Sequence, residues 1–182
     1  MFAPVKMIRR AIGRFCKARE GSTAIEFGFV AVPFFMLVIG VAEVSMVGFM
    51  QTTLDQAVDR RAREIRTGQA QENGVTYDEI QDAICADVNF LLNVDCEANL
   101  FLDVRTFPSF VDAADNLANP IVNGQLNPAG FGFQPGASSE IVVVRAYYRW
   151  HVMTPMFQAI FANAGNGDRL LVSTMMFRNE PF

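Results

Sequence analysis

Two acidic residues stand in an otherwise apolar stretch near the N-terminus of this sequence. Glu26 and Glu43 are the only charged residues between positions 24 and 50, and residues 27–42 contain none. A carboxylate within an apolar segment is energetically costly and is usually paired with a cation or a polar neighbour. The chemistry that these two residues indicate is therefore charge pairing at the borders of an apolar element.

Groups suited to catalysis are sparse. His151, beside Trp150, is the only histidine in the sequence. This excludes a histidine-rich metal site, and any Ser-His-Asp arrangement would depend on this one residue. The sequence has no glycine-rich phosphate loop and no zinc-ligand spacing. We expect a structural role for His151, no cofactor, no metal and no enzymatic activity.

The element that carries both acidic residues has the composition of a membrane-spanning helix. Residues 24–50 exceed the roughly 20 apolar residues that a bilayer core requires. Residues 1–20 hold six basic residues and one acidic residue, whereas the rest of the chain holds nine basic and 18 acidic residues. Basic residues flanking one end place that end in the cytoplasm. We expect a single pass with a cytoplasmic N-terminus.

Two other interpretations of the apolar run fit less well. A cleaved secretory signal ends at once in a small-x-small site, and a buried core helix does not explain the basic flank. Here the run continues into a helical pattern of Met46, Phe49, Met50, Leu54, Ala57, Val58, Ala62 and Ile65. Pro33 lies inside the run and predicts a kink, because proline removes one backbone hydrogen bond.

The residues at the start of the apolar run resemble a processing site. Gly21 follows a basic leader and precedes four small or apolar residues, after which come Glu26 and Phe27. This pattern is similar to the cleavage region of type IV pilin-like proteins. With Pro33 and Glu43 at their spacing, it resembles more closely the TadE-like family, which are minor pilin-like proteins, or pseudopilins, of tight-adherence (Flp) pilus systems.

The resemblance covers roughly residues 19–50, and it implies that a prepilin peptidase cuts between Gly21 and Ser22. Gly21 suits such a cut because it has no side chain to obstruct a protease pocket. The chain would then be a substrate of that enzyme. Residues 1–21 would be lost, together with Cys16.

The resemblance also suggests a partner for Glu26. The new α-amino group of Ser22 would be cationic and could pair with Glu26 of the same or a neighbouring subunit. Alternatively, Glu26 lies in the headgroup layer, where the helix dipole favours a negative charge. Glu43, about 25 Å further along the helix, either reaches into the opposite interface or contacts another helix of an assembly.

Cys85 and Cys96 lie beyond the membrane on the expected topology. An oxidising compartment allows them to form a disulfide, whereas free buried thiols are the alternative. We expect the disulfide, which would join the second helix to the chain that enters the first strand.

The remainder of the sequence predicts an α+β fold, with a long N-terminal helix packed on a small antiparallel sheet in the pilin-like manner. Apolar spacing and β-branched runs predict a helix over residues 23–67 that stops at Gly68, a helix over 77–92, strands over Leu100–Phe107, 140–152 and 170–177, a short helix over 154–161, and a long loop over 116–139. The expected domains are a leader (1–21), a helix (22–67) and an extracytoplasmic head (68–182).

Phe131 and Phe133 stand within the predicted loop. They are either exposed contacts for a partner or anchors that hold the loop on the sheet, and we favour the second interpretation.

Two classes of function remain. The favoured one is a minor pilin-like subunit of the inner membrane or the pilus, which acts through helix packing and head contacts. Its partners would be the prepilin peptidase, other pilin-like subunits, inner-membrane pilus assembly proteins and membrane lipid. The alternative is a single-pass envelope-anchored binding module that is neither processed nor assembled. Nucleic acid is not expected as a partner, because the acidic body offers no basic face.

Overall fold

The computed structural model describes residues 22–88, 95–117 and 119–182. Gly21, Cys16 and the last residues of the helix predicted over 77–92 lie outside these ranges. By their internal contacts, the residues form two compact units, Met1–Ala42 and Glu43–Phe182, and each is described by itself. This division lies within the long N-terminal helix.

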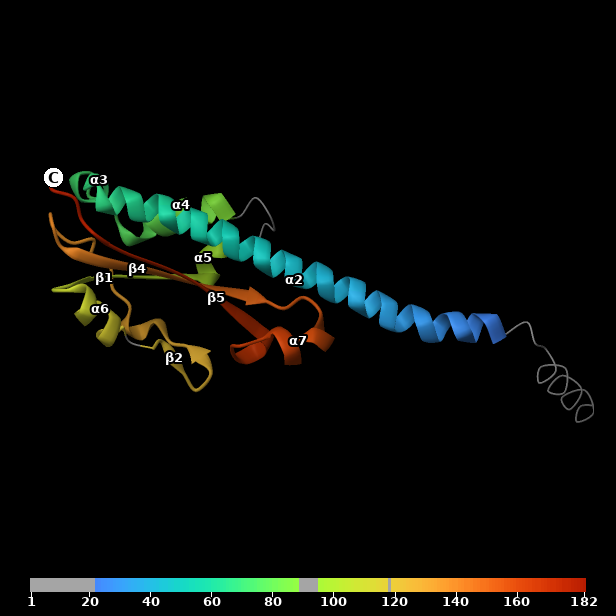
Figure 1. Ribbon diagram of the computed structural model, residues 1–182. Helices are drawn as coiled ribbons and strands as arrows, with labels where there is room; N and C mark the ends of the chain where they lie inside the picture. The colour runs from blue at the N-terminus through green and yellow to red at the C-terminus, as the bar shows by residue number, and fades with distance from the viewer. Residues whose placement is uncertain (1–21, 89–94, 118) are drawn as a thin grey trace, which may run out of the picture. The chain divides into compact units, whose positions relative to one another are not determined.

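The long helix α2, Ser22–Arg66, continues through Pro33 (Figure 1). Its end is fixed by Gly68, whose φ of 82° lies in the left-handed region that glycine adopts without strain. The N–H of Gly68 donates to the carbonyl of Ile65 at 3.1 Å, which satisfies one of the last carbonyls of the helix. The predicted helix and its stop are therefore confirmed to within one residue.

The other elements all belong to the second unit. In chain order they are α3 (Gln69–Glu72), α4 (Tyr77–Val88), α5 (Cys96–Asn99), β1 (Leu100–Phe107), α6 (Phe110–Asn116), β2 (Ile121–Val122), β3 (Gln125–Leu126), a 3-10 turn (Pro128–Gly130), β4 (Ile141–His151), α7 (Pro155–Phe161), a second 3-10 turn (Gly165–Gly167) and β5 (Asp168–Arg178). The three predicted strands are confirmed. Helix α6 and the β2–β3 hairpin were not predicted, and the hairpin lies inside the expected loop.

Strands β1, β4 and β5 form an antiparallel sheet with β4 in the centre. Leu100 pairs with Tyr148 and Phe107 with Ile141, while His151 pairs with Asp168 across to β5. Figure 1 shows α2 and α4 on one side of this sheet and α6 with the β2–β3 hairpin on the other. The predicted α+β class and antiparallel sheet are confirmed, although the sheet carries a helix on both faces.

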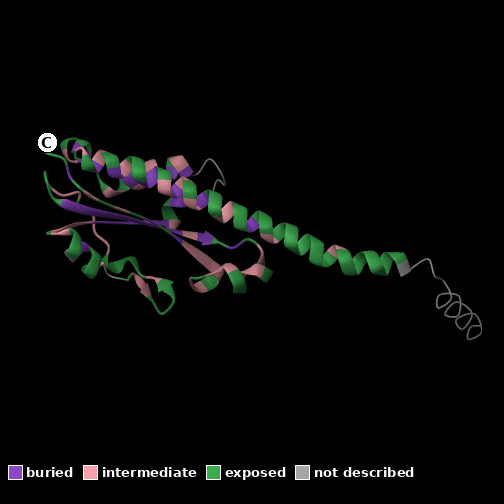
Figure 2. Cartoon of the chain, in the orientation of Figure 1, coloured by how far each residue is buried: buried purple, intermediate pink, exposed green. Residues whose placement is uncertain are grey.

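The core lies between residues 43–66 of α2, helix α4 and one face of the sheet. Alternate residues of β4 point to this face, as the period of two in a strand requires. The core is built from Met50, Leu54, Ala57, Val58, Ala62 and Ile65 of α2, Ile80, Ile84 and Val88 of α4, and Leu100, Leu102, Val104, Val142, Val144, Ala146, Tyr148, Trp150 and Leu171 of the sheet. Figure 2 shows the resulting band of buried residues along β4 and the facing helix.

The opposite face of the sheet holds a buried ion pair. Asp103 and Arg145 are register partners on β1 and β4, and their side chains meet at 2.5 Å. Asp103 also accepts from Arg105 at 2.8 Å and from the backbone N–H of Gly132 at 3.0 Å. Burial raises the pKa of Asp103, but the hydrogen bonds from Arg105, Arg145 and Gly132 together hold that pKa below its usual value.

Two aromatic contacts fix the long loop on this unit. The Phe131 ring stacks on the Tyr147 ring with centroids 5.2 Å apart. Phe133 meets Tyr77 edge to face at 6.3 Å and forms a β-bridge with Val104. The two phenylalanines therefore hold the loop in place, as the favoured interpretation predicted.

Cys85 of α4 and Cys96 of α5 form a disulfide, with their Cα atoms 5.6 Å apart. Both residues are buried at the edge of the core. The bridge joins α4 to the chain that enters β1, which is the connection that the sequence suggested.

Replacing both cysteines, Cys85→Ser with Cys96→Ser, should lower the free energy of unfolding by about 3 kcal/mol, because the cross-link closes a short loop in the unfolded chain. The single tryptophan, Trp150, is buried in the core, so its fluorescence reports urea unfolding of the detergent-solubilised chain. Reduction of the unmodified protein should give the same loss. An unchanged midpoint in both experiments would contradict a structural disulfide.

Replacing Asp103→Asn should lower the free energy of unfolding by about 3–5 kcal/mol, because it leaves Arg145 charged and buried without its counter-charge. The matched control is Arg105→Gln, which removes a more exposed cation from the same carboxylate and should cost less. The double variant Asp103→Leu with Arg145→Met should recover much of the loss.

The same pair predicts an acid dependence. Because the native pKa of Asp103 is lowered, its contribution to stability is complete above the unfolded pKa of about 3.9 and is lost as the pH falls through the native pKa. The difference in unfolding midpoint between the unmodified chain and Asp103→Asn should therefore shrink as the pH falls below the unfolded pKa of about 3.9. A constant difference across this range would exclude Asp103 as the titrating group.

Candidate functional site

The first functional feature is the uncharged stretch of α2. The helix contains a span of mean hydropathy 2.2 that is long and apolar enough to cross a membrane, by length and composition. None of the most apolar window is buried within the protein. Residues 23–42 would extend about 30 Å at 1.5 Å per residue, which equals the thickness of a bilayer core.

The residues of the expected processing site begin this helix. Helix α2 starts at Ser22, so the predicted cut after Gly21 would leave a chain whose first residue opens the helix. Glu26 and Phe27 lie in its first two turns, and both are exposed. The described residues therefore bring Glu26 close to the position that a new N-terminus at Ser22 would occupy.

A shallow apolar hollow lies further along the same stretch. It is lined by Ile25, Gly28, Phe29, Val32 and Pro33. A side chain built at Gly28 would meet no atom within 4 Å, so there is open space beside this glycine. Small residues of this kind allow helices to approach closely in membranes. Pro33 thus borders a surface that could accept a second helix.

Glu43 is the first residue of the second unit, and it is buried. Its side chain is 3% exposed, and one carboxylate oxygen accepts from the backbone N–H of Thr154 at 3.3 Å. The other oxygen makes no hydrogen bond to any residue that the structure describes. Sequence reasoning placed Glu43 in an interface or a helix assembly and did not foresee this contact. No local signal could have revealed it, because the two residues lie 111 positions apart.

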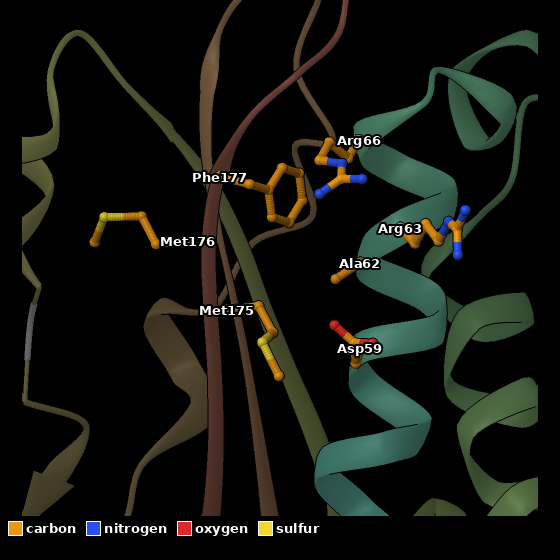
Figure 3. Close-up of a pocket in the computed structure, with 7 residues that line it drawn as sticks. All are labelled: Asp59, Ala62, Arg63, Arg66, Met175, Met176 and Phe177. Atoms are coloured by element: carbon orange, nitrogen blue, oxygen red, sulfur yellow. The ribbon is translucent and has the colours of Figure 1, made fainter.

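An open groove runs between the end of α2 and the edge strand β5. Its lining residues are Asp59, Ala62, Arg63, Arg66, Met175, Met176 and Phe177. Figure 3 shows Phe177 and Met175 facing the helix, whereas Met176 points away from it. Arg66 is paired with Glu180 at 3.3 Å. The groove offers apolar side chains, the guanidinium groups of Arg63 and Arg66 and the carboxylate of Asp59, and this mixture suits binding.

His151 lies at the end of β4, where its Nδ1 atom is 2.8 Å from a carboxylate oxygen of Asp168, its register partner on β5. The pair borders a hollow lined by Asn99, Tyr148, Arg149, Trp150, His151, Met153 and Asp168. This lining contains no serine, threonine or cysteine. His151 and Asp168 form the last residue pair between β4 and β5, and their contact links the ends of these two strands. The lining residues offer no hydroxyl or thiol of serine, threonine or cysteine for the histidine to activate.

Metal-ligating residues do not gather elsewhere in the part of the chain that the structure describes. Within residues 22–88, 95–117 and 119–182, no three side chains of His, Cys, Asp or Glu are placed to hold a metal ion. The features that remain are an apolar helix, a buried acid at its border and binding surfaces.

Comparison with known proteins gives a family match for the apolar helix α2. The family model described as TadE-like protein matches residues 21–63, which is almost the whole of α2. No curated protein and no solved structure matches the chain. The match includes Gly21, Glu26, Pro33 and Glu43, the residues on which the sequence resemblance was based. Over residues 21–63 the chain is thus similar to the TadE-like protein family, and the resemblance that its sequence motif indicated is confirmed.

Proposed function

We propose that the chain is a minor pilin-like component of a tight-adherence pilus system, held in the inner membrane by α2 with its head outside the cytoplasm. The observation that carries this proposal is the coincidence of the TadE-like match with α2. The matched segment contains both the uncharged stretch and the residues that pack on the sheet. The helix thus has one part suited to lipid or to other helices and another that carries a folded head.

The proposed mechanism is assembly. Most apolar side chains of residues 27–42 are exposed, and they lie on all sides of the helix. Such a surface requires lipid while the protein is stored and neighbouring helices once it is assembled. The hollow beside Gly28 and Pro33 is a place where a neighbouring helix could pack closely. Glu26 would align subunits by pairing with the cationic N-terminus of an adjacent chain.

Processing by a prepilin peptidase is the step that separates this function from that of a simple anchored module. We expect the mature protein in cells to begin at Ser22, because the cut after Gly21 would expose the α-amino group that Glu26 requires. N-terminal sequencing of the protein purified from membranes measures this directly. In cells without the peptidase, the residues before Ser22 should remain attached.

The matched variants are Gly21→Val and Gly28→Val. The first places a branched side chain at the expected cut and should block processing. The second changes a glycine that has open space around it and should still be processed. An intact leader in the unmodified protein, in cells with active peptidase, would refute the proposed processing.

Replacing Glu26→Ala should leave membrane insertion intact and should strongly reduce the number of pili. A carboxylate at the border of the apolar stretch is not needed for insertion, but its loss removes the partner of the N-terminal charge. Membrane fractionation and counts of surface pili separate the two effects. The control is Glu72→Ala, which removes an exposed glutamate of the head and should leave pili unchanged. Normal piliation of Glu26→Ala would count against the pairing.

A further inference from the structure

A second uncharged segment lies in the head, between the end of β4 and the start of β5. Residues 152–167 contain no Asp, Glu, Lys or Arg, although 19% of the whole chain is charged. Helix α7 forms the central part of this segment. Segments of this composition are uncommon on a surface that faces only water.

One face of this segment exposes large apolar side chains. Met153, Met156 and Ile160 have exposed fractions of 54%, 56% and 71%. Met156 and Ile160 lie four residues apart in α7 and therefore on one side of that helix, and Met153 stands just before its start. Phe157 and Phe161 are half-buried, and their rings pair at 5.5 Å. The short helix therefore turns its aromatic rings towards the protein and presents its aliphatic side chains outward.

Hydrogen bonds hold the segment in this orientation. The Gln158 side chain donates to the carbonyl of Val152 at 3.3 Å, and Arg169 donates to the carbonyl of Phe161 at 3.1 Å. The backbone N–H groups of Asn163 and Ala164 both donate to the carbonyl of Asp168. The exposed residues are thus fixed on the outside by the architecture around them.

The segment also contacts the residue that follows the apolar stretch of α2. The hydrogen bond from Thr154 to Glu43 connects the residue before α7 to the residue that directly follows Ala42. If residues 23–42 cross the bilayer core, Glu43 comes at its outer boundary. The start of α7 is held at that same level.

We propose that α7 lies in the outer headgroup layer of the membrane, with Met153, Met156 and Ile160 inserted among the upper acyl chains. This second membrane contact rests on the proposed anchoring by α2. Lipid is the occupant that the position favours, because the residue before α7 contacts Glu43, which directly follows the membrane-spanning stretch in the chain, and because interfacial helices bury an apolar face at this depth.

The opposite end of the sheet provides the contrast. Helix α6 follows β1 at the end of the sheet where Phe107 pairs with Ile141. Helix α7 follows β4 at the other end, where His151 pairs with Asp168. Figure 1 shows the two short helices at opposite ends. Val111 of α6 is 69% exposed, close to the value for Ile160, but α6 also carries Asp112 and Asp115.

These residues allow a matched test on the full chain. Cys16→Ser leaves the disulfide as the sole cysteine pair, so that one added cysteine takes one environment-sensitive fluorophore. Ile160→Cys tests α7, Val111→Cys is the head control, and Leu37→Cys reports the anchor, with a similar exposed fraction of 65%. Each labelled protein is reconstituted in phosphatidylethanolamine–phosphatidylglycerol vesicles, with and without lipids that carry a quenching group on the acyl chain.

We expect loss of emission in quencher-containing vesicles for the probes at positions 37 and 160, and no loss at 111. Quenching at 37 but not at 160 would overturn this inference and leave the anchor intact. A blue-shifted probe at 160 that lipid does not quench would indicate a protein partner instead, and would also overturn it. Absence of quenching at 37 would refute the anchoring, and the inference with it.

Discussion

A single continuous helix has to satisfy two different surroundings, and the rest of the structure follows from this constraint. Residues 27–42 of α2 are uncharged and carry exposed apolar side chains, whereas the second part of the helix buries its apolar stripe against the sheet. Glu43 lies at the boundary between the exposed apolar stretch and the part of the helix that packs on the sheet. Its burial against Thr154 places the first contact of the folded head at Glu43, before the long helix ends.

Because α2 occupies one face of the sheet, the other face needs its own cover. Strand β4 is buried on both faces, which explains why its apolar residues form a run in place of a simple alternation. The long loop supplies part of this cover through Phe131, which stacks on Tyr147, and the Asp103–Arg145 pair fixes the register beneath it. Phe133 of the same loop packs instead against Tyr77 of α4, on the side of the sheet that α2 covers. A buried ion pair is weak evidence of stability, but it penalises any shift of β1 against β4 that would separate the two charges.

The helix, the three strands and the disulfide were predictable because each leaves a local signal: apolar spacing, β-branched runs, or two cysteines in the same compartment. The Glu43–Thr154 and Asp103–Arg145 contacts were not predictable. Their partners are far apart in the sequence and are brought together by the topology, so neither residue type nor spacing indicates the contact. Helix α6 was missed because its seven residues include two aspartates and little apolar periodicity. The motif of Gly21, Glu26, Pro33 and Glu43 was recognisable from the sequence, and it lies within the TadE-like match. The surfaces of the head have no comparable sequence pattern.

The strand order β1–β4–β5 has a consequence for how the protein is made. On the proposed orientation, the amphipathic half of α2 leaves the membrane early, but the central strand that must cover it arrives only after most of the head has been transported. Until residue 151 has crossed, Leu54, Val58 and Ile65 have no sheet to pack on. The newly exported chain therefore passes through a stage with an uncovered apolar stripe beside the bilayer, and a chain stalled there would be a natural target for envelope chaperones and proteases.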